Sequence, residues 1–189
     1  MLTWLRKGSI ERACAFFVRG GGQVPCPLCG GMLECFGTRL RGCIQANGEK
    51  ILLSLRRLRC TNEACNRVHH ELPSSLVPYK RHACASIESA CTPRIESHGI
   101  DVVAEDSTIS RWKRWMEASA QYWNGSLRAI SSRMGMDPGM ISEASSASPL
   151  QSLLELAGQQ PGWLAQLVRS LVNAGLWIQT RSACMSGTS

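Results

Sequence analysis

The sequence has no long uninterrupted apolar run and no secretion signal. A membrane-spanning helix needs about 18 or more consecutive apolar residues, and the longest candidates are interrupted by Glu11, Arg12, Arg19 or Arg169. The stretch from Ala13 to Val18 is too short for the apolar core of a signal peptide and leads to no cleavage-like sequence. These absences argue against a membrane protein and predict a cytoplasmic one.

A phosphate-binding glycine loop and an internal repeat are also absent. Gly20-Gly21-Gly22 is followed neither by a Lys-Ser or Lys-Thr pair nor by a clear helix, so these glycines do not predict a nucleotide site. No small-molecule substrate is expected. Apolar residues make up 44% of the chain and charged residues 19%, which is typical of a chain that folds around a packed core.

Acidic residues are few beside the basic ones, and the net charge is +7. Between residues 39 and 59 the only acid is Glu49. The cations of this stretch are Arg39, Arg41, Lys50, Arg56, Arg57 and Arg59. Such a patch favours a polyanionic partner, although charge alone leaves a merely basic protein equally open.

The ten cysteines include two closely spaced pairs. In a reducing compartment such pairs more often hold metal than form disulfides. Cys26-Pro-Leu-Cys29-Gly is the first pair, and Cys60 and Cys65 are the second. Four thiolates form a closed tetrahedral zinc site with no open position for catalysis. The sequence therefore predicts one structural Zn²⁺ ion bound by Cys26, Cys29, Cys60 and Cys65.

A β-hairpin is predicted between the two cysteine pairs. Residues 32–44 and 50–58 have strand-like composition, and Asn47-Gly48 between them is typical of a tight two-residue turn, because both residues tolerate a positive φ. Gly30 is predicted to adopt the left-handed conformation that turns backbone N–H groups toward the sulfurs.

The remaining cysteines and the neighbouring histidines leave alternatives open. Cys35 and Cys43 are expected to be packed free cysteines on the first strand, and His69 and His70 to be exposed on the strand after the second pair. Any of these four could instead replace a ligand or form a second site. The others, Cys14, Cys84, Cys91 and Cys184, lack metal-ligand spacing and are expected to be packing or surface residues.

A helix is predicted to begin at Asp106 or Ser107, either of which can cap its first turn. A buried stripe at helical spacing consists of Ile109, Trp112, Trp115 or Met116, and Trp123. The residues off this stripe include Ser107, Thr108, Ser110, Arg111, Lys113 and Arg114. With the helix expected over 83–98, this pattern suits a helix-turn-helix, and an amphipathic core helix with a basic exposed face is the open alternative.

The sequence thus predicts an α+β fold: a small zinc-ribbon hairpin domain, then an all-α helix-turn-helix segment, then a C-terminal helical pair. The expected segments are a short leader helix over 1–22, the zinc ribbon over 23–80, a helix-turn-helix-like helical domain over 81–136, a linker over 137–149, C-terminal helices over 150–175 and a flexible tail over 176–189.

The order of these motifs resembles the N-terminal zinc ribbon of insertion-sequence transposases. The resemblance rests on Cys26-Pro-Leu-Cys29-Gly30, on the strand that ends Arg57-Leu-Arg-Cys60, on the second cysteine pair and on the segment from His70-Glu-Leu-Pro73 to Arg81. Residues 107–115 resemble the helix-turn-helix that accompanies this ribbon, and short bacterial proteins with these two modules alone are also similar. The resemblance covers about residues 23–120 and implies sequence-directed DNA binding, with residues 107–114 reading bases.

Such transposases continue into an RNase H-like catalytic domain, whereas the residues after Gln121 are predicted to be helices and linker. A closed four-cysteine site also rules out a zinc-dependent nuclease. No enzymatic activity is therefore expected.

The leading hypothesis is a non-catalytic DNA-binding protein of mobile-element origin, associated with the bacterial nucleoid. Double-stranded DNA is the expected partner, with a transposase or a second copy of the chain left open. Phosphate contacts are expected from Arg39, Arg41, Arg56, Arg57 and Arg59, and groove contacts from Ser107, Thr108, Ser110, Arg111, Lys113 and Arg114.

The alternative hypothesis is a protein-interaction adaptor that docks on a partner such as a full-length transposase. Its apolar face would consist of Trp163, Leu164, Leu167, Val168, Leu171 and Val172. The same residues could equally pack on the preceding helix.

Overall fold

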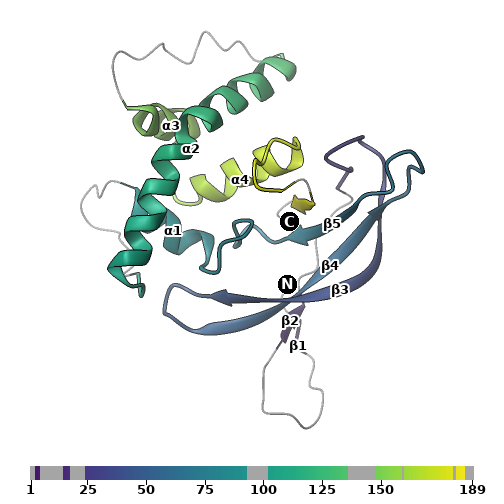
Figure 1. The fold of residues 1–189 in the computed structure, drawn as a ribbon, viewed down its shortest axis with the longest axis horizontal. Coiled ribbons are helices and arrows are strands. Elements are labelled where there is room, and N and C mark those ends of the chain that lie inside the picture. The colour runs from purple at the N-terminus through teal and green to yellow at the C-terminus, as the bar shows by residue number, and fades with distance from the viewer. Residues whose placement is uncertain are drawn as a thin grey trace.

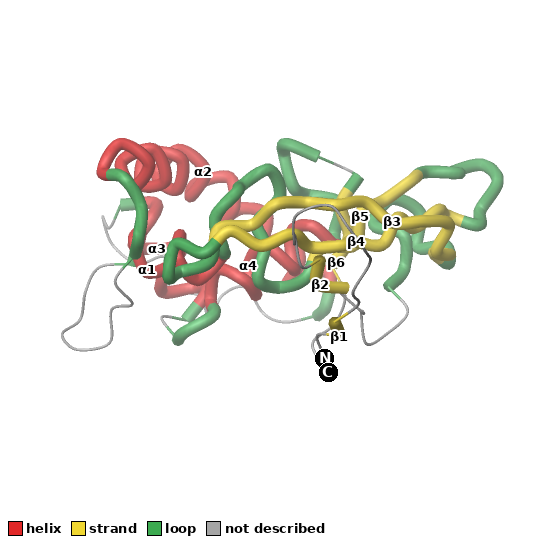
Figure 2. Tube along the Cα trace, turned by 90° about the horizontal axis from the view of Figure 1, so that it is seen from below, coloured by secondary structure: helices red, strands yellow, loops and turns green. Residues whose placement is uncertain are grey.

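The fold joins a β-sheet to a group of helices (Figure 1). The computed structural model describes residues 3–4, 15–17, 24–92, 102–135, 148–158, 160–180 and 182–185. Strands come first along the chain, then helices and one short final strand, which confirms the predicted α+β class. The helices gather at one end of the molecule, and the long hairpin runs out from them (Figure 2).

The sheet is built on a long antiparallel hairpin, as the sequence predicts. Strand β3 (Leu33–Ile44) pairs with strand β4 (Lys50–Cys60) along its whole length. The register shifts between Cys35 and Gly37, where β3 carries a bulge.

The hairpin turn is one residue longer than the predicted two-residue turn. Gln45 and Glu49 are joined by a backbone hydrogen bond of 2.8 Å, so residues 46–48 form the loop. The Asn47 side chain accepts the Glu49 N–H at 3.0 Å, and Gly48 has a φ of 82°. A glycine in the left-handed conformation is typical of a three-residue hairpin loop.

The second edge of β4 is shared by two other strands. The remaining strands are β1 (Thr3–Trp4), β2 (Ala15–Phe17), β5 (Val68–Leu72) and β6 (Ala183–Met185). Strand β5 pairs antiparallel with the end of β4 and parallel with β6, whereas β2 pairs parallel with the part of β4 nearer the turn and antiparallel with β1.

Strands β1 and β2 correct the leader helix predicted over residues 1–22, since both described pieces of that segment are strands. Beside Leu52–Ser54, β4 has backbone groups that β5 does not reach, and β2 pairs with them. Because buried backbone groups must find partners, this pairing outweighs the local helical tendency of the segment.

Four helices follow the sheet in the described part of the chain. They are α1 (Cys84–Cys91), α2 (Asp106–Arg133), α3 (Pro149–Ala157) and α4 (Trp163–Asn173). Helices α3 and α4 lie where the two C-terminal helices are predicted. Residues 93–101 and 136–147 lie outside the described residues, and with them the turn of the predicted helix-turn-helix and most of the linker predicted over 137–149. No described helix is both long and apolar enough to cross a bilayer.

Helix α2 packs its predicted stripe into the core. Its buried residues include Trp112, Met116, Ala120 and Trp123, which recur at helical spacing. The helix begins at Asp106, as predicted, and Glu105 occupies the N-cap position without a capping hydrogen bond from its side chain.

A single buried cluster links the segments predicted as separate units. Leu55 of β4, Met116 of α2 and Leu164 of α4 belong to it, together with Trp177. Glu88 of α1 also accepts hydrogen bonds from the Gly162 and Leu164 N–H groups, at 2.7 and 2.9 Å, at the start of α4. The helices and the sheet therefore share one hydrophobic core.

The flexible tail predicted over residues 176–189 is corrected at residues 176–180 and 182–185, the part of it that the structure describes. The Trp177 ring is buried and stacks on Trp123 at a centroid distance of 5.5 Å. Strand β6 is also buried, and the Asn173 side chain exchanges two hydrogen bonds with the Met185 backbone, at 2.9 and 2.8 Å. Tertiary contacts therefore order a segment whose small polar residues suggest fraying.

Candidate metal centre and basic surfaces

Four cysteine sulfurs meet at the end of the hairpin opposite its turn. Cys26 and Cys29 precede β3, Cys60 is the last residue of β4, and Cys65 follows it. Their sulfur atoms all lie within 4.8 Å of one another. The four cysteines predicted as ligands are therefore clustered and can hold one metal ion.

The sulfur separations fit a tetrahedral metal. The Cys26 and Cys65 sulfurs are 3.8 Å apart, and the Cys29 and Cys60 sulfurs are 3.5 Å apart. Two metal–sulfur bonds of about 2.3 Å at a tetrahedral angle put two sulfurs about 3.8 Å apart. These two separations are consistent with zinc, and all four sulfurs are close enough to hold one metal ion.

In both cysteine turns the residue after the second cysteine has a left-handed backbone conformation. Gly30, after the second cysteine of the first pair, has a φ of 72°, and Asn66, after the second cysteine of the other pair, has a φ of 42°. Their N–H groups donate to the carbonyl oxygens of Cys26 and Asn62, each at 2.8 Å. The left-handed conformation predicted at Gly30 is confirmed, and Asn is among the residues that tolerate it at Asn66.

Gly31 lies against the sulfurs. A Cβ atom at this position would be 3.2 Å from the Cys60 sulfur and 3.3 Å from the Cys29 sulfur. A side chain here would therefore require the neighbouring sulfurs to shift by a few tenths of an ångström, and glycine avoids this.

The thiols differ in acidity when no metal binds them. A hydrogen bond from the Gly31 backbone, assisted by the Cys60 side chain, lowers the pKa of Cys29 to about 7. Desolvation raises the pKa of Cys60 to about 12. One thiolate thus forms near neutral pH, whereas full ionisation of the set requires a bound cation.

His69 lies beside the cluster, which corrects its predicted exposure. Its side chain is fully buried, and its Nε2 atom is 3.3 Å from the Cys26 sulfur. An N–H group at this position donates to a thiolate and orients it. Sequence evidence for this burial is weak, because two adjacent histidines in a polar strand do not reveal which ring faces inward.

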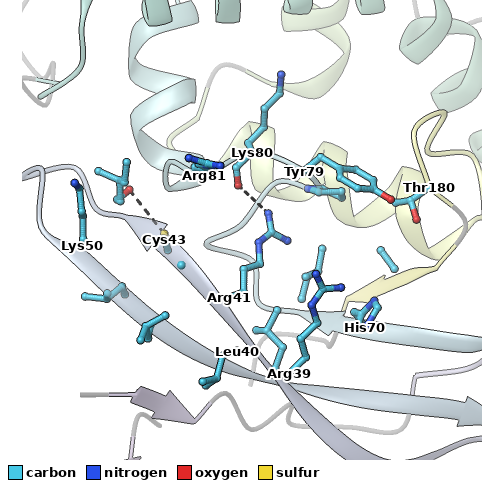
Figure 3. Close-up of a pocket in the computed structure, with 18 of the residues that line it drawn as sticks. Arg39, Leu40, Arg41, Cys43, Lys50, His70, Tyr79, Lys80, Arg81 and Thr180 are labelled. Atoms are coloured by element: carbon cyan, nitrogen blue, oxygen red, sulfur yellow. Dashed lines mark hydrogen bonds between the residues drawn. The ribbon is translucent and has the colours of Figure 1, made fainter. Parts of the chain in front are cut away.

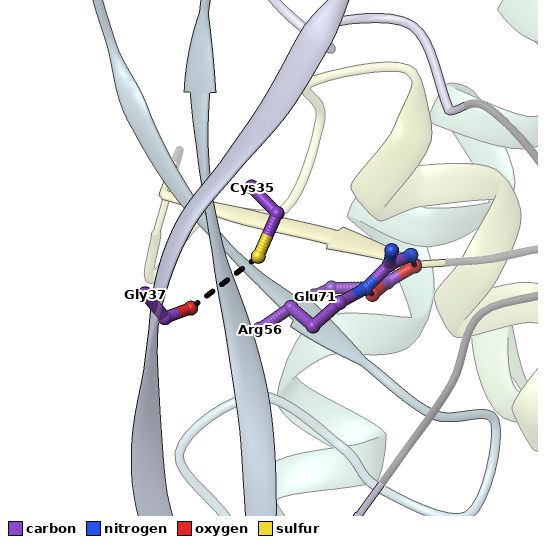
Figure 4. Close-up of polar contacts among 4 residues, drawn as sticks. All are labelled: Cys35, Gly37, Arg56 and Glu71. Carbon is purple, nitrogen blue, oxygen red and sulfur yellow. Dashed lines mark hydrogen bonds and ion pairs between the residues drawn. The ribbon is translucent and has the colours of Figure 1, made fainter.

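The two other cysteines of β3 differ from each other, and only Cys35 lies toward the metal end of the strand. Cys43 is buried, as predicted, whereas Cys35 is exposed and donates to the Gly37 carbonyl oxygen at 3.6 Å (Figure 4). The bulge at this point of β3 turns the Cys35 sulfur away from the core.

Arg56 binds a buried carboxylate, which the sequence did not reveal. Its guanidinium group pairs with Glu71 on β5 through both Nε and Nη2, the latter at 2.8 Å from Oε1 (Figure 4). Glu71 is 1% exposed. The hydrogen bond to Glu71 raises the pKa of Arg56, so this arginine remains charged and neutralises the carboxylate.

Arg41 is also engaged within the fold. Its Nη2 atom donates to the carbonyl oxygens of Val77 and Lys80, at 2.9 and 2.8 Å. The guanidinium groups of Arg41 and Arg56 therefore stabilise the fold and are not free to bind phosphate.

Two arginines predicted to contact DNA lie near the metal cluster, Arg59 exposed and Arg57 half-buried. Arg57 and Arg59 lie over the Phe36 ring, with guanidinium carbons 4.6 and 4.7 Å from its centroid. Phe36 is 40% exposed. We call these three residues the ribbon surface.

A second basic surface lies on the first turns of α2. Ser107, Ser110, Arg111, Lys113 and Arg114 are exposed, and Thr108 is half-buried. Ser107, Ser110, Arg111 and Arg114 follow the spacing of one helical face, and Arg111 donates to the Ser107 carbonyl oxygen at 3.1 Å. We call this face the helix surface.

The two basic surfaces lie toward opposite ends of the hairpin. The Val103 N–H, just before α2, donates to Ala46 in the hairpin turn at 3.5 Å, whereas Arg59 is next to Cys60 at the metal end. A strand rises about 3.3 Å per residue, so the two ends of β4 are about 30 Å apart.

Residues 26–112 match a known family model. The family is described as "Domain of unknown function (DUF6431)". The matched range contains the whole cysteine cluster, the ribbon surface and the start of α2, and its description assigns no activity. Comparison with curated proteins and with solved structures gives no match.

The apolar face of the adaptor hypothesis is not available at the surface. Each of its six residues is buried in the core. These residues are Trp163, Leu164, Leu167, Val168, Leu171 and Val172. They pack inside the molecule, which was the open alternative at the level of the sequence.

Proposed function

We propose that this chain is a non-catalytic, zinc-dependent protein that binds double-stranded DNA. The proposal extends to a bacterial, nucleoid-associated role and to descent from a mobile element, which rests on the resemblance to insertion-sequence transposases. The observation that carries it is the exposed Arg59 and the half-buried Arg57 over one aromatic ring, beside a cluster of four cysteine sulfurs. No observation on the described surface favours the adaptor alternative.

Zinc is the metal that the donor set fits best. Four cysteine sulfurs at tetrahedral separations suit Zn²⁺, and they close its coordination sphere. The ion would join the turn before β3 to the turn after β4, and would thereby hold the end of the hairpin. It would supply structure and no open position for a substrate.

The ribbon surface is suited to phosphate. Arg57 and Arg59 stack on one aromatic ring, which limits their side-chain freedom before any ligand binds. Guanidinium groups held in this way lose less entropy when they bind phosphate oxygens. The helix surface adds hydroxyls and cations that suit groove contacts.

The separation of the two surfaces sets the length of DNA required. One turn of a DNA duplex spans about 34 Å, or about 10 base pairs, which is close to the length of β4. A duplex that contacts both surfaces therefore lies along the hairpin. Affinity should rise sharply between duplexes of about 8 and about 16 base pairs, because only the longer one reaches both surfaces.

The first experiment measures binding to a labelled duplex by fluorescence anisotropy at several salt concentrations. Arg59→Ala should weaken binding to all sequences and reduce the salt dependence by about 0.9 in log–log slope per lost phosphate contact. Arg133→Ala is the matched control, because Arg133 is equally charged and exposed but lies in the last turn of α2. An equal slope for wild type and Arg59→Ala would contradict the assignment of the ribbon surface.

The second experiment tests sequence recognition. Duplexes bound by the zinc-loaded protein are selected from a random pool, and the selection is repeated with Arg111→Ala and Arg114→Ala. A recovered motif that these variants lose supports base reading by the helix surface. If no duplex binds at low salt, DNA binding is refuted and the adaptor alternative becomes the one to pursue.

A further inference from the structure

A large basic cavity lies between the hairpin and the segments that cover it (Figure 3). Its volume is about 1150 Å³, and it is bordered by β3, β4, the turn at residues 78–81, Thr180 and the segment 182–183. The charged residues that line it are Arg39, Arg41, Lys50, Lys80 and Arg81, with Glu49 as the only acid. Ligand pockets usually occupy about 300–1,000 Å³, so the cavity has more room than a lone phosphate needs.

Two of these cations are already engaged. Arg41 donates to backbone carbonyl oxygens, and the Lys80 ammonium group lies 4.0 Å from the centroid of the Trp115 ring. The other three, Arg39, Lys50 and Arg81, are exposed, and their side chains make no hydrogen bond or ion pair with any described residue. These three cations are available to an anionic ligand.

The pKa of His70 reflects the positive charge around the cavity. Burial, together with the positive charges of Arg39, Arg57 and Arg41, lowers the pKa of this histidine. The imidazole is therefore neutral at pH 7 and offers one donor and one acceptor to a ligand.

Tyr79 brings an exposed aromatic ring to the same cavity in a strained conformation. The Lys80 N–H donates to the Val77 carbonyl oxygen at 3.1 Å, and the residues between them are Pro78 and Tyr79, the latter with a φ of 62°. These are the features of a type II turn, which normally carries glycine where Tyr79 stands. Tyr79 is nevertheless 71% exposed.

Arg41 explains how the strained turn is held. Its two hydrogen bonds go to the carbonyl oxygens of Val77 and Lys80, which are the first and last residues of the turn. A bulky residue with a positive φ persists only where the surroundings impose it, and such residues are frequent at ligand sites. The fold therefore holds the Tyr79 ring at the cavity, although burial of this ring does not offset the strain of its positive φ.

We infer that this cavity binds an unpaired nucleotide of a nucleic-acid strand, with phosphate held by Arg39 and Arg81 and the base stacked on Tyr79. Proteins bind single strands with two elements: cations placed along the nucleic-acid backbone, and exposed aromatic rings on which the bases stack. A duplex does not satisfy the site, because its bases are already stacked on one another. The inference deepens the proposed function, on which it rests for the choice of nucleic acid as ligand.

The test compares single-stranded and duplex probes by fluorescence anisotropy on the zinc-loaded full chain. The probes are a labelled oligothymidylate of about 12 nucleotides, the oligouridylate of equal length and a blunt duplex. Tyr79→Ala should weaken binding of the single strands about tenfold and leave the duplex unchanged. Tyr79→Phe should bind as wild type, because the ring is retained.

Two further variants keep the test independent of folding. Tyr79→Gly removes the ring and relieves the strained backbone, so loss of single-strand binding by a variant that melts no lower than wild type isolates the role of the ring. Arg39→Ala should weaken binding of single strands, whereas the matched Arg133→Ala should not. Preference for the thymidylate or the uridylate identifies the strand as DNA or RNA.

Each outcome is decisive. If wild type binds the duplex but neither single strand, or if Tyr79→Gly and wild type bind single strands equally, the inference is overturned and the proposed function stands. Binding of single strands without binding of the duplex supports the inference and refutes the proposed function. If Tyr79→Ala loses the same affinity for single strands as for the duplex, the assignment of the cavity to unpaired nucleotides is overturned.

Discussion

The ion pair between Arg56 and Glu71 should be a main support of the sheet. Arg56 on β4 and Glu71 on β5 join two strands, and the Glu71 side chain is 1% exposed, whereas that of Arg56 is 33% exposed. Arg56→Ala would leave a buried carboxylate without its cation. Breaking a buried pair costs about 3–5 kcal/mol, and the solvent that reaches Arg56 places the expected loss near the lower end, about 3 kcal/mol.

The measurement is urea unfolding of the zinc-loaded protein, followed by circular dichroism, on a double-mutant cycle. Arg56→Ala and Glu71→Ala should each be destabilising, and the double variant should lose less than the sum, with a coupling of about 2 kcal/mol. Arg59→Ala is the control, because Arg59 is exposed and its loss should change the free energy of unfolding by about 0.5 kcal/mol or less.

Additive losses in this cycle would refute the pairing, as would a loss at Arg56 no larger than at Arg59. The cycle also separates stability from binding. Under conditions where the Arg56→Ala variant is folded, its affinity for duplex DNA should stay close to that of wild type, since its guanidinium group points into the fold. A large loss of affinity for duplex DNA by the folded variant would indicate that Arg56 contacts phosphate.

Three other predictions test the metal, the strained turn and the buried thiols. Chelation of the metal should release one zinc ion per chain and lower the melting temperature, and Cys60→Ser should reproduce this; an unchanged melting curve would argue against a structural ion. Tyr79→Gly should raise the free energy of unfolding by about 1 kcal/mol, because relief of a strained φ of about 1–3 kcal/mol outweighs the added freedom of the unfolded chain; lower stability in urea would contradict the strain. Burial raises the pKa of Cys84 from 9.0 to about 12. The contribution of this thiol to the free energy of unfolding is therefore complete below pH 9 and is lost as the pH rises toward 12, because in that range the thiol ionises only in the unfolded chain. Cys84→Ala should therefore lose less stability than wild type between these two pH values, and parallel pH profiles would exclude this effect.

The metal cluster was predictable because its determinants are local. The short spacing within each cysteine pair and the glycine at Gly30 specify turns whose backbone geometry hardly depends on the rest of the chain. The same holds for the hairpin and for the buried stripe of α2, because alternation and helical spacing follow from backbone periodicity. The sequence by itself therefore determined the α+β class, the place of the hairpin and the cysteines that meet.

Only the tertiary structure decided how the charged and polar residues are used. Arg56 and Arg57 are neighbours in sequence, yet one neutralises a buried carboxylate and the other lies over the Phe36 ring. His69 and Trp177 were expected at the surface or in a fraying tail, and both are buried by segments distant in sequence. Such roles depend on which strand or helix is brought alongside, and periodicity within one segment carries no information about that neighbour.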